Sequence, residues 1–247
     1  MKAWLEVDIS GLRKILERRG KEHAIYELVQ NAWDEDVTKV EVILNRPVSG
    51  SSELVVTDDS PTGWQNLTHS YTMFAESYKK RNPEKRGAFN LGEKFVLSLC
   101  YPNETSITTT TGKVFFDKDG RHTGRTKRER GSEFRGTMRL TVAEWERMCD
   151  SAMKLIPPVP TFFNGHEIPF RQPIKTWTAK LPTVIADEEG NLRRTERQTT
   201  ISVYEVLRTE TAALYEMGIP VVDIDCKYHV SIGQKVPLNI DRDNVTP

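Results

Sequence analysis

The sequence predicts an α+β fold in which amphipathic helices accompany antiparallel β-hairpins. Apolar residues recur with helical spacing in residues 9–19 and 24–36. Apolar and polar residues alternate between turn residues in 38–57 and 105–117, which predicts strands there. With 247 residues and 37% apolar content, the chain can bury a substantial core in one large domain or two modest ones.

Two helices are expected first. Residues 9–19 end near Gly20, which is well placed as a helix C-cap. Residues 24–36 carry an apolar stripe, namely Ile25, Leu28, Val29 and Ala32, and a neighbouring polar stripe, namely Glu27, Asn31 and Asp34. An amide oxygen can bind Mg²⁺ without adding charge, and a carboxylate one turn earlier can orient and deprotonate a water molecule. Such a pair suits a metal-bound phosphate ester, although in isolation it is more often a solvated helix edge.

A hairpin of residues 38–44 and 53–57 follows, and its second strand ends at Asp58. The segment TDDSPTGW then continues through a Pro and Gly turn, which leaves the backbone free to approach a flat ring. A carboxylate there can accept a hydrogen bond from the amine of adenine, whereas guanine would present a carbonyl. Taken alone, the segment is also consistent with an ordinary Asp-rich turn.

Residues 64–74 are expected to form a helix, after which a basic loop leads into another. The loop carries Lys79, Lys80, Arg81, Lys85 and Arg86. Gly87, Asn90 and Gly92 precede the apolar run FVLSLC, so a helix is expected to begin at Gly92 and to receive phosphates at its free N–H groups. Lys94, just inside this helix, is the candidate for a direct phosphate contact. The spacing excludes a Walker P-loop.

The next segments predict further sheet elements. Residues 105–117 are expected to form a hairpin, and residues 117–134 an exposed basic excursion. A nucleic-acid patch in this excursion is disfavoured because aromatic residues do not interleave with its charges. Residues 135–148 predict a strand and a helix with a capping box of Thr141 and Glu144, and the hairpin of residues 159–170 is expected to end the sheet.

Residues 172–247 predict a second β-rich unit, or an extension of the first sheet, after a division near Arg171. The stretches KTWTAKL, TTISVYEVL and VVDIDCKYHVSI alternate as strands do. Lys235 follows the last of them in SIGQKVP, where an exposed turn is the simpler interpretation.

Composition excludes some function classes. The 35 lysine and arginine residues balance the 35 aspartate and glutamate residues, so no bulk charge draws the chain to nucleic acid or to an anionic membrane. No apolar run approaches the roughly 18 residues that a membrane helix needs. Cys100, Cys149 and Cys226 are interpreted as buried free thiols in a reducing compartment, and the protein is expected in the cytoplasm.

The order of these segments resembles the GHKL ATPases, which include gyrase B, MutL-type mismatch-repair proteins, heat-shock chaperones, MORC proteins and sensor histidine kinases. The pair Glu27 and Asn31 resembles the N-box of the family, and Asp58 to Gly63 resembles its D-x-G-x-G box. Residues 87–92, G-A-F-N-L-G, resemble the G-x-x-G-x-G lid, and Gly136-Thr137 the Gly-Thr that closes the pocket. The resemblance spans residues 27–138.

Three departures from the family pattern stand in these boxes. Ser60 replaces the first glycine of the D-x-G-x-G box, and Thr62 lengthens its loop by one residue. Asn90 replaces the middle glycine of the lid, which is tolerable because Asn adopts left-handed conformations more readily than most residues.

The resemblance implies a fold and a set of roles. The fold would be the Bergerat fold, a two-layer α/β sandwich with a mixed, mostly antiparallel sheet and helices on one face. This ATP-binding domain would occupy residues 1–171, followed by a β-rich extension or partial transducer-like domain in 172–247. Glu27 would be the general base and Asn31 the Mg²⁺ ligand. The other expected nucleotide contacts are Asp34, Asp58, Gly63, Lys85, Arg86, Gly87, Asn90, Leu91, Gly92, Lys94, Thr137 and Lys235.

The function implied is a slow, Mg²⁺-dependent ATPase that couples bound ATP or ADP to lid closure and to dimerisation or domain rearrangement. The alternative is a nucleotide-gated binding module with little turnover in a DNA- or protein-remodelling complex. A nucleotide-dependent homodimer and a DNA or protein client are the partners considered, and no membrane is expected. A sensor histidine kinase is disfavoured, because no helical segment with a phosphoacceptor histidine precedes Glu27.

Overall fold

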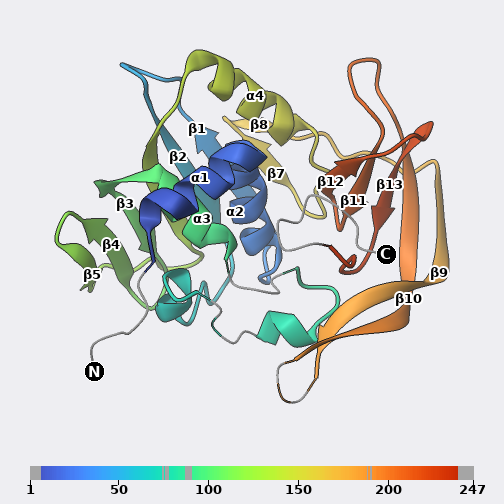
Figure 1. Cartoon of the computed structure of the whole chain (residues 1–247), viewed down its shortest axis with the longest axis horizontal. Helices are drawn as coiled ribbons and strands as arrows, with labels where there is room; N and C mark the ends of the chain where they lie inside the picture. Colours follow the sequence, from blue (N-terminus) through green and yellow to red (C-terminus); the bar gives the residue numbers. More distant parts are fainter. Residues whose placement is uncertain are drawn as a thin grey trace.

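The computed structural model describes residues 7–73, 75, 78–86, 91–187, 189 and 191–238. Strands account for 39% of the structure and helices for 21%. The strands form two mixed sheets, one of eight strands and one of five (Figure 1). The expected two-layer α/β sandwich with helices on one face is therefore wrong. This expectation failed because the C-terminal third of the chain forms a five-stranded sheet of its own instead of a small extension.

The eight-stranded sheet has the order β5-β4-β3-β6-β2-β1-β7-β8. Its strands are β1 (Val40–Leu44), β2 (Ser51–Asp58), β3 (Cys100–Thr108), β4 (Lys113–Asp117), β5 (Gly120–Gly124), β6 (Glu133–Arg139), β7 (Thr161–Phe163) and β8 (His166–Glu167). The β1–β2 and β3–β4 hairpins are confirmed, and the β7–β8 hairpin lies at the end of this sheet as predicted. The segment expected as an exposed basic excursion contains the largely exposed strand β5, which pairs with β4.

Four α-helices and two 3₁₀ turns complete this half of the chain. They are α1 (Ile9–Arg19), α2 (His23–Trp33), α3 (Gly92–Leu99), α4 (Val142–Met153), η1 (Leu67–Ser70) and η2 (Tyr78–Arg81). Gly20 is the C-cap of α1, and the capping box of α4 is confirmed. The expected helix in residues 64–74 is wrong, because the described part of that segment contains only η1.

The main core lies between α2 and the centre of the eight-stranded sheet. The predicted apolar stripe of α2 is buried and contacts β1 and β2. Ile25, Leu54, Ile107 and Met138 are fully buried in this cluster. On the opposite face of β1 and β6, alternate residues are solvent-exposed. Burial of one strand face thus fixes the register that positions Asp58 at the end of β2.

The five-stranded sheet has the order β12-β11-β13-β10-β9. Its strands are β9 (Lys175–Ala186), β10 (Leu192–Glu205), β11 (Ala213–Glu216), β12 (Ile219–Asp223) and β13 (Tyr228–Ile232). The stretch VVDIDCKYHVSI, expected as one strand, contributes to two, β12 and β13. Figure 1 shows this sheet at the end of the molecule opposite to β4 and β5.

Two further expectations concern the cysteines and membrane-spanning helices. The three cysteines are free, but only Cys100 is buried, whereas Cys226 is exposed, so the expectation of three buried thiols is wrong. Within the described residues, no helix is long and apolar enough to cross a membrane.

Candidate functional site

Glu27 lies on α2 where this helix meets the first residue of α3. A Cβ atom at Gly92 would overlap the Glu27 carboxylate, so the glycine leaves room for this carboxylate at the start of α3. The Glu27 side chain is buried, and one of its oxygens, Oε1, is 3.9 Å from Nη2 of Arg19. A carboxylate is thereby held against the amide-bearing start of a helix, where an anion is favoured.

Asn31, one turn along α2, is oriented by Glu93 of α3. The Asn31 amide nitrogen, Nδ2, donates to Glu93 Oε2 over 2.8 Å. Because a carboxylate accepts hydrogen bonds and does not donate them, this contact leaves the amide oxygen of Asn31 turned away from Glu93. The other Glu93 oxygen accepts from Lys94 Nζ at 2.8 Å. Glu93 therefore holds both an amide suited to Mg²⁺ and a cation suited to phosphate.

Lys94 is a buried cation. Its ammonium also donates to the carbonyl of His69. Burial lowers the pKa of the Lys94 ammonium from its ordinary value, while the Glu93 carboxylate opposes this effect. A phosphate at the start of α3 would have to replace these two acceptors.

Asp58, at the end of β2, is held by a loop that precedes β6. Its Oδ1 accepts from the backbone N–H of Ser60 at 2.9 Å and from that of Ser132 at 3.2 Å. Gly131 has φ +73°, and a Cβ atom there would overlap the Asp58 carbonyl oxygen. The loop can close against Asp58 only because residue 131 is glycine. Gly63, which also has positive φ, lies against Gly131.

The Asp58 carboxylate borders a small apolar cavity. The cavity has a volume of about 20 Å³, which is space for about one water molecule. Its lining includes Leu28 and Ala32 of α2, together with Trp64 and Ser132. The backbone N–H of Trp64 donates to the Ser132 hydroxyl at 2.9 Å, which closes one side. An adenine ring could enter only if the Trp64 segment moved outward.

Burial raises the pKa of the Asp58 carboxyl to about 6 from 3.8, against the Ser60 and Ser132 amides, which lower it. Because the folded-state pKa is the higher one, this group stabilises the fold fully below pH 3.8, and the contribution is lost as the pH rises through about 6. Asp58→Asn keeps the shape but cannot ionise, and is expected to remove this loss. Urea unfolding of wild type and variant at several pH values between about 4 and 7 measures the free energy of unfolding and thus its change with pH. Equal pH slopes in both proteins would contradict the assignment, and Asp150→Asn, at an exposed position of α4, is the control.

Asp34 does not border the Asp58 cavity, contrary to expectation. It instead holds the basic loop: its Oδ2 lies 3.4 Å from Lys79 Nζ, and its Oδ1 accepts from the backbone N–H of Arg86 at 3.3 Å. The Lys85 ammonium donates to the Asp34 carbonyl. The carboxylate at the end of α2 thus anchors residues 79–86.

The same loop is tied to the five-stranded sheet. Arg86 Nε donates to the Glu216 carbonyl at 2.7 Å, and both side chains are buried. Lys235 Nζ donates to the Lys79 carbonyl at 2.5 Å, and the Lys235 backbone N–H donates to the Pro83 carbonyl at 2.8 Å. Arg86 and Lys235, expected to contact phosphate, are therefore engaged with protein acceptors here.

Thr137 is not beside Asp58, so the expectation that its hydroxyl helps to hold adenine there is wrong. β6 runs antiparallel to β2, and Thr137 pairs with Glu53 near the start of β2. The hydroxyl that lies at the Asp58 cavity belongs to Ser132, at the other end of the β6 pairing. Gly131-Ser132 has the same sequence pattern as Gly136-Thr137, namely a glycine followed by a residue with a hydroxyl group, and it directly precedes a strand. Glu93 was missed because no family box includes it.

Of the remaining expected contacts, Leu91 and Gly92 lie at the start of α3. Leu91 is its N-cap, and the Leu91 carbonyl accepts from the backbone N–H of Lys94 at 3.0 Å. Gly87 and Asn90 fall outside the described residues.

Comparison with family models and with curated proteins found no match. Among solved structures, the N-terminal domain of a DNA repair protein aligns with 92% of this chain and 89% of its own length. The sequence identity is 13% and the TM-score 0.47. At this TM-score the likeness carries no argument about fold or function, so the site is interpreted from its own residues.

Proposed function

We propose that the chain binds ATP with Mg²⁺ and hydrolyses it slowly, as a module whose site resembles that of the GHKL ATPases. The observation that carries the proposal is the position of α2 between two features. At one side, Glu27 and Asn31 of α2 meet the start of α3. On the same helix, Leu28 and Ala32 line the cavity that Asp58 borders. A purine at Asp58 would therefore have its phosphates within reach of the α3 N-terminus.

In this proposal each residue has a distinct role. The Asp58 carboxylate accepts from the adenine amine, and the N–H groups at the start of α3 receive phosphate oxygens. Glu27 orients a water molecule and takes its proton. Asn31 offers its amide oxygen to Mg²⁺, and Glu93 holds that amide in place. When bound, Mg²⁺ would neutralise charge on the transferred phosphate.

Nucleotide binding would also act on the basic loop. Phosphate would compete for Lys94, which now contacts Glu93, and for Lys235, which now contacts the Lys79 carbonyl. Release of Lys235 from this loop would change a contact between the loop and the five-stranded sheet. Such a change supports coupling of nucleotide state to lid closure, and to domain rearrangement or dimerisation.

Asp58→Ala tests the adenine assignment. The variant loses a charged acceptor, so its ATP affinity is expected to fall by roughly 10- to 100-fold. Isothermal titration calorimetry with Mg-ATP and Mg-GTP measures this, with Asp150→Asn on the exposed surface of α4 as the control. Wild type is expected to bind ATP more tightly than GTP. In Asp58→Asn the ratio of these two affinities is expected to be smaller, since an amide can donate to the guanine carbonyl. An ATP affinity unchanged in Asp58→Ala would contradict the assignment.

A second candidate is a nucleotide-gated binding module with little turnover, which acts on a DNA or protein client. The position of Arg19 favours it, because Arg19 Nη2 lies 3.9 Å from Glu27 Oε1, so this oxygen is engaged with a cation and not with a water molecule to be activated. The two candidates differ in turnover and not in binding.

A further inference from the structure

The eight-stranded sheet ends in a basic edge that the proposed ATP site does not use. Residues 113–130 contain seven lysine and arginine residues and only three carboxylates, although the whole chain is neutral. Five of these cations have no carboxylate within 4.0 Å in the described part of the chain: Lys113, Lys118, Arg121, Arg125 and Lys127. A surface with several unneutralised cations concentrates positive potential and attracts polyanions.

Aromatic rings lie on the two strands of this edge and next to them. Phe115 of β4 pairs directly with His122 of β5, and their rings stack with centroids 5.2 Å apart. Phe115 is 36% exposed and the His122 side chain 42%. On another side of β5, the Arg121 guanidinium lies 3.6 Å from the ring centroid of Tyr71. The exposed Phe115–His122 pair beside cations of the same edge is the combination that stacks a base while holding its phosphates.

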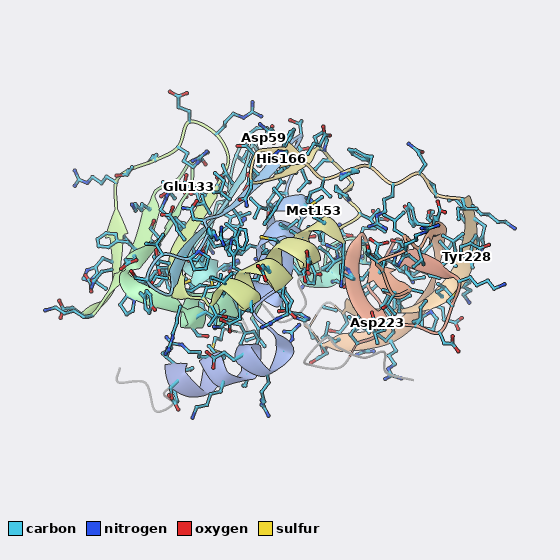
Figure 2. The ribbon with its side chains drawn as sticks, turned by 90° about the horizontal axis from the view of Figure 1, so that it is seen from above. Asp59, Glu133, Met153, His166, Asp223 and Tyr228 are labelled. Carbon is cyan, nitrogen blue, oxygen red and sulfur yellow. The ribbon has the colours of Figure 1, made fainter. Side chains whose placement is uncertain are left out.

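Hydrogen bonds to neighbouring segments fix the position of this surface. The backbone N–H of Arg128 donates to the Thr109 carbonyl at 2.9 Å, and that of Gly131 donates to Ser60 at 2.7 Å. The guanidinium of Arg130 donates to the carbonyl of Asp59. These bonds hold residues 125–131 along the sheet. In Figure 2, Glu133 marks this end, and Asp223 and Tyr228 of the five-stranded sheet mark the opposite one.

We propose that the β4–β5 edge and residues 125–130 form a binding surface for single-stranded nucleic acid. The cations contact phosphates without reading sequence, and the Phe115–His122 pair stacks a base. Among the described residues, β5 is an edge strand that pairs with β4 alone, so one side of its backbone has no strand partner there. A flat anionic membrane or an acidic peptide would neutralise the cations, but neither offers a planar base that could stack on the Phe115–His122 pair.

Fluorescence anisotropy of the full chain with a labelled oligothymidine of about 20 nucleotides, longer than one such site needs, tests this proposal. Arg121→Glu/Arg125→Glu/Lys127→Glu is expected to weaken binding by roughly tenfold or more and to reduce the slope of log affinity against log salt by about 2. The matched control is Lys14→Glu/Arg18→Glu/Arg147→Glu, which changes net charge equally on exposed positions of α1 and α4. It is expected to bind nearly as wild type does.

Phe115→Ala separates the ring pair from the charge. It is expected to weaken oligonucleotide binding by roughly tenfold with an unchanged salt slope. Equal losses in the patch and control variants, or no loss in Phe115→Ala, would overturn the proposal. So would equal competition by polyglutamate, or binding to phosphatidylserine vesicles without binding to the oligonucleotide. The assay contains no ATP, so its outcome is independent of the proposed ATPase function.

Discussion

Glu27→Gln is expected to lower kcat for ATP hydrolysis by about 10²- to 10⁴-fold, because glutamine cannot take a proton from the attacking water. ATP affinity is expected to stay nearly unchanged, since the amide keeps the shape of the side chain and Glu27 contacts water in the proposed mechanism, not the nucleotide. Phosphate release under saturating Mg-ATP measures turnover, and calorimetry measures binding.

Glu17→Gln, on the exposed part of α1, is the matched control and should turn over as wild type does. Equal turnover in wild type and Glu27→Gln would remove Glu27 from the chemistry. Tight ATP binding with negligible turnover in both proteins would instead favour the nucleotide-gated binding module.

Arg86→Ala is expected to lower the free energy of unfolding by about 3–5 kcal/mol, because it leaves a buried carboxylate without its cation. The Arg86 and Glu216 side chains are 2% and 3% exposed, with Arg86 Nε 3.9 Å from Glu216 Oε2. Arg86 also lies over the Trp33 ring. Denaturant unfolding followed by tryptophan fluorescence measures the change.

The double variant Arg86→Met/Glu216→Leu should recover most of the lost stability, because it removes both charges of this buried pair. Arg208→Ala, an exposed arginine of the C-terminal half, is the control and should change stability by no more than about 0.5 kcal/mol. A loss below about 1 kcal/mol in Arg86→Ala would show that the Glu216 carboxylate does not depend on this ion pair.

Sequence patterns predicted the hairpins well because both strands of a hairpin are neighbours in the chain. β1 and β2, and likewise β3 and β4, are joined by short turns that carry their own residue signals. The start of α3 at Gly92 was predicted for the same reason, since a helix start is specified locally. The fold class was not predicted, because the size of the second sheet depends on pairings between residues that are distant in the chain, such as those of β13 with β10 and with β11.

The position of a candidate-site residue was predicted where it depends only on the residue's own helix face or strand end. Glu27 and Asn31 share a helix face, and Asp58 ends its strand. Thr137 and Ser132 could not be distinguished this way. Both follow a glycine, and only the β2–β6 register decides which one meets Asp58. The contacts of Arg86 and Lys235 depend on how the second sheet docks, which no local pattern encodes.

The parallel pairing of β1 with β7 has a consequence for biosynthesis. Val42 pairs with Phe163, so the outer neighbour of β1 is made long after β1 itself. As the chain emerges from the ribosome, β1 and β2 can form their hairpin early, but the free edge of β1 must wait for most of the first sheet to be translated. During that interval the nascent chain exposes an unsatisfied strand edge, which makes this the stage at which a chaperone would do most to prevent aggregation.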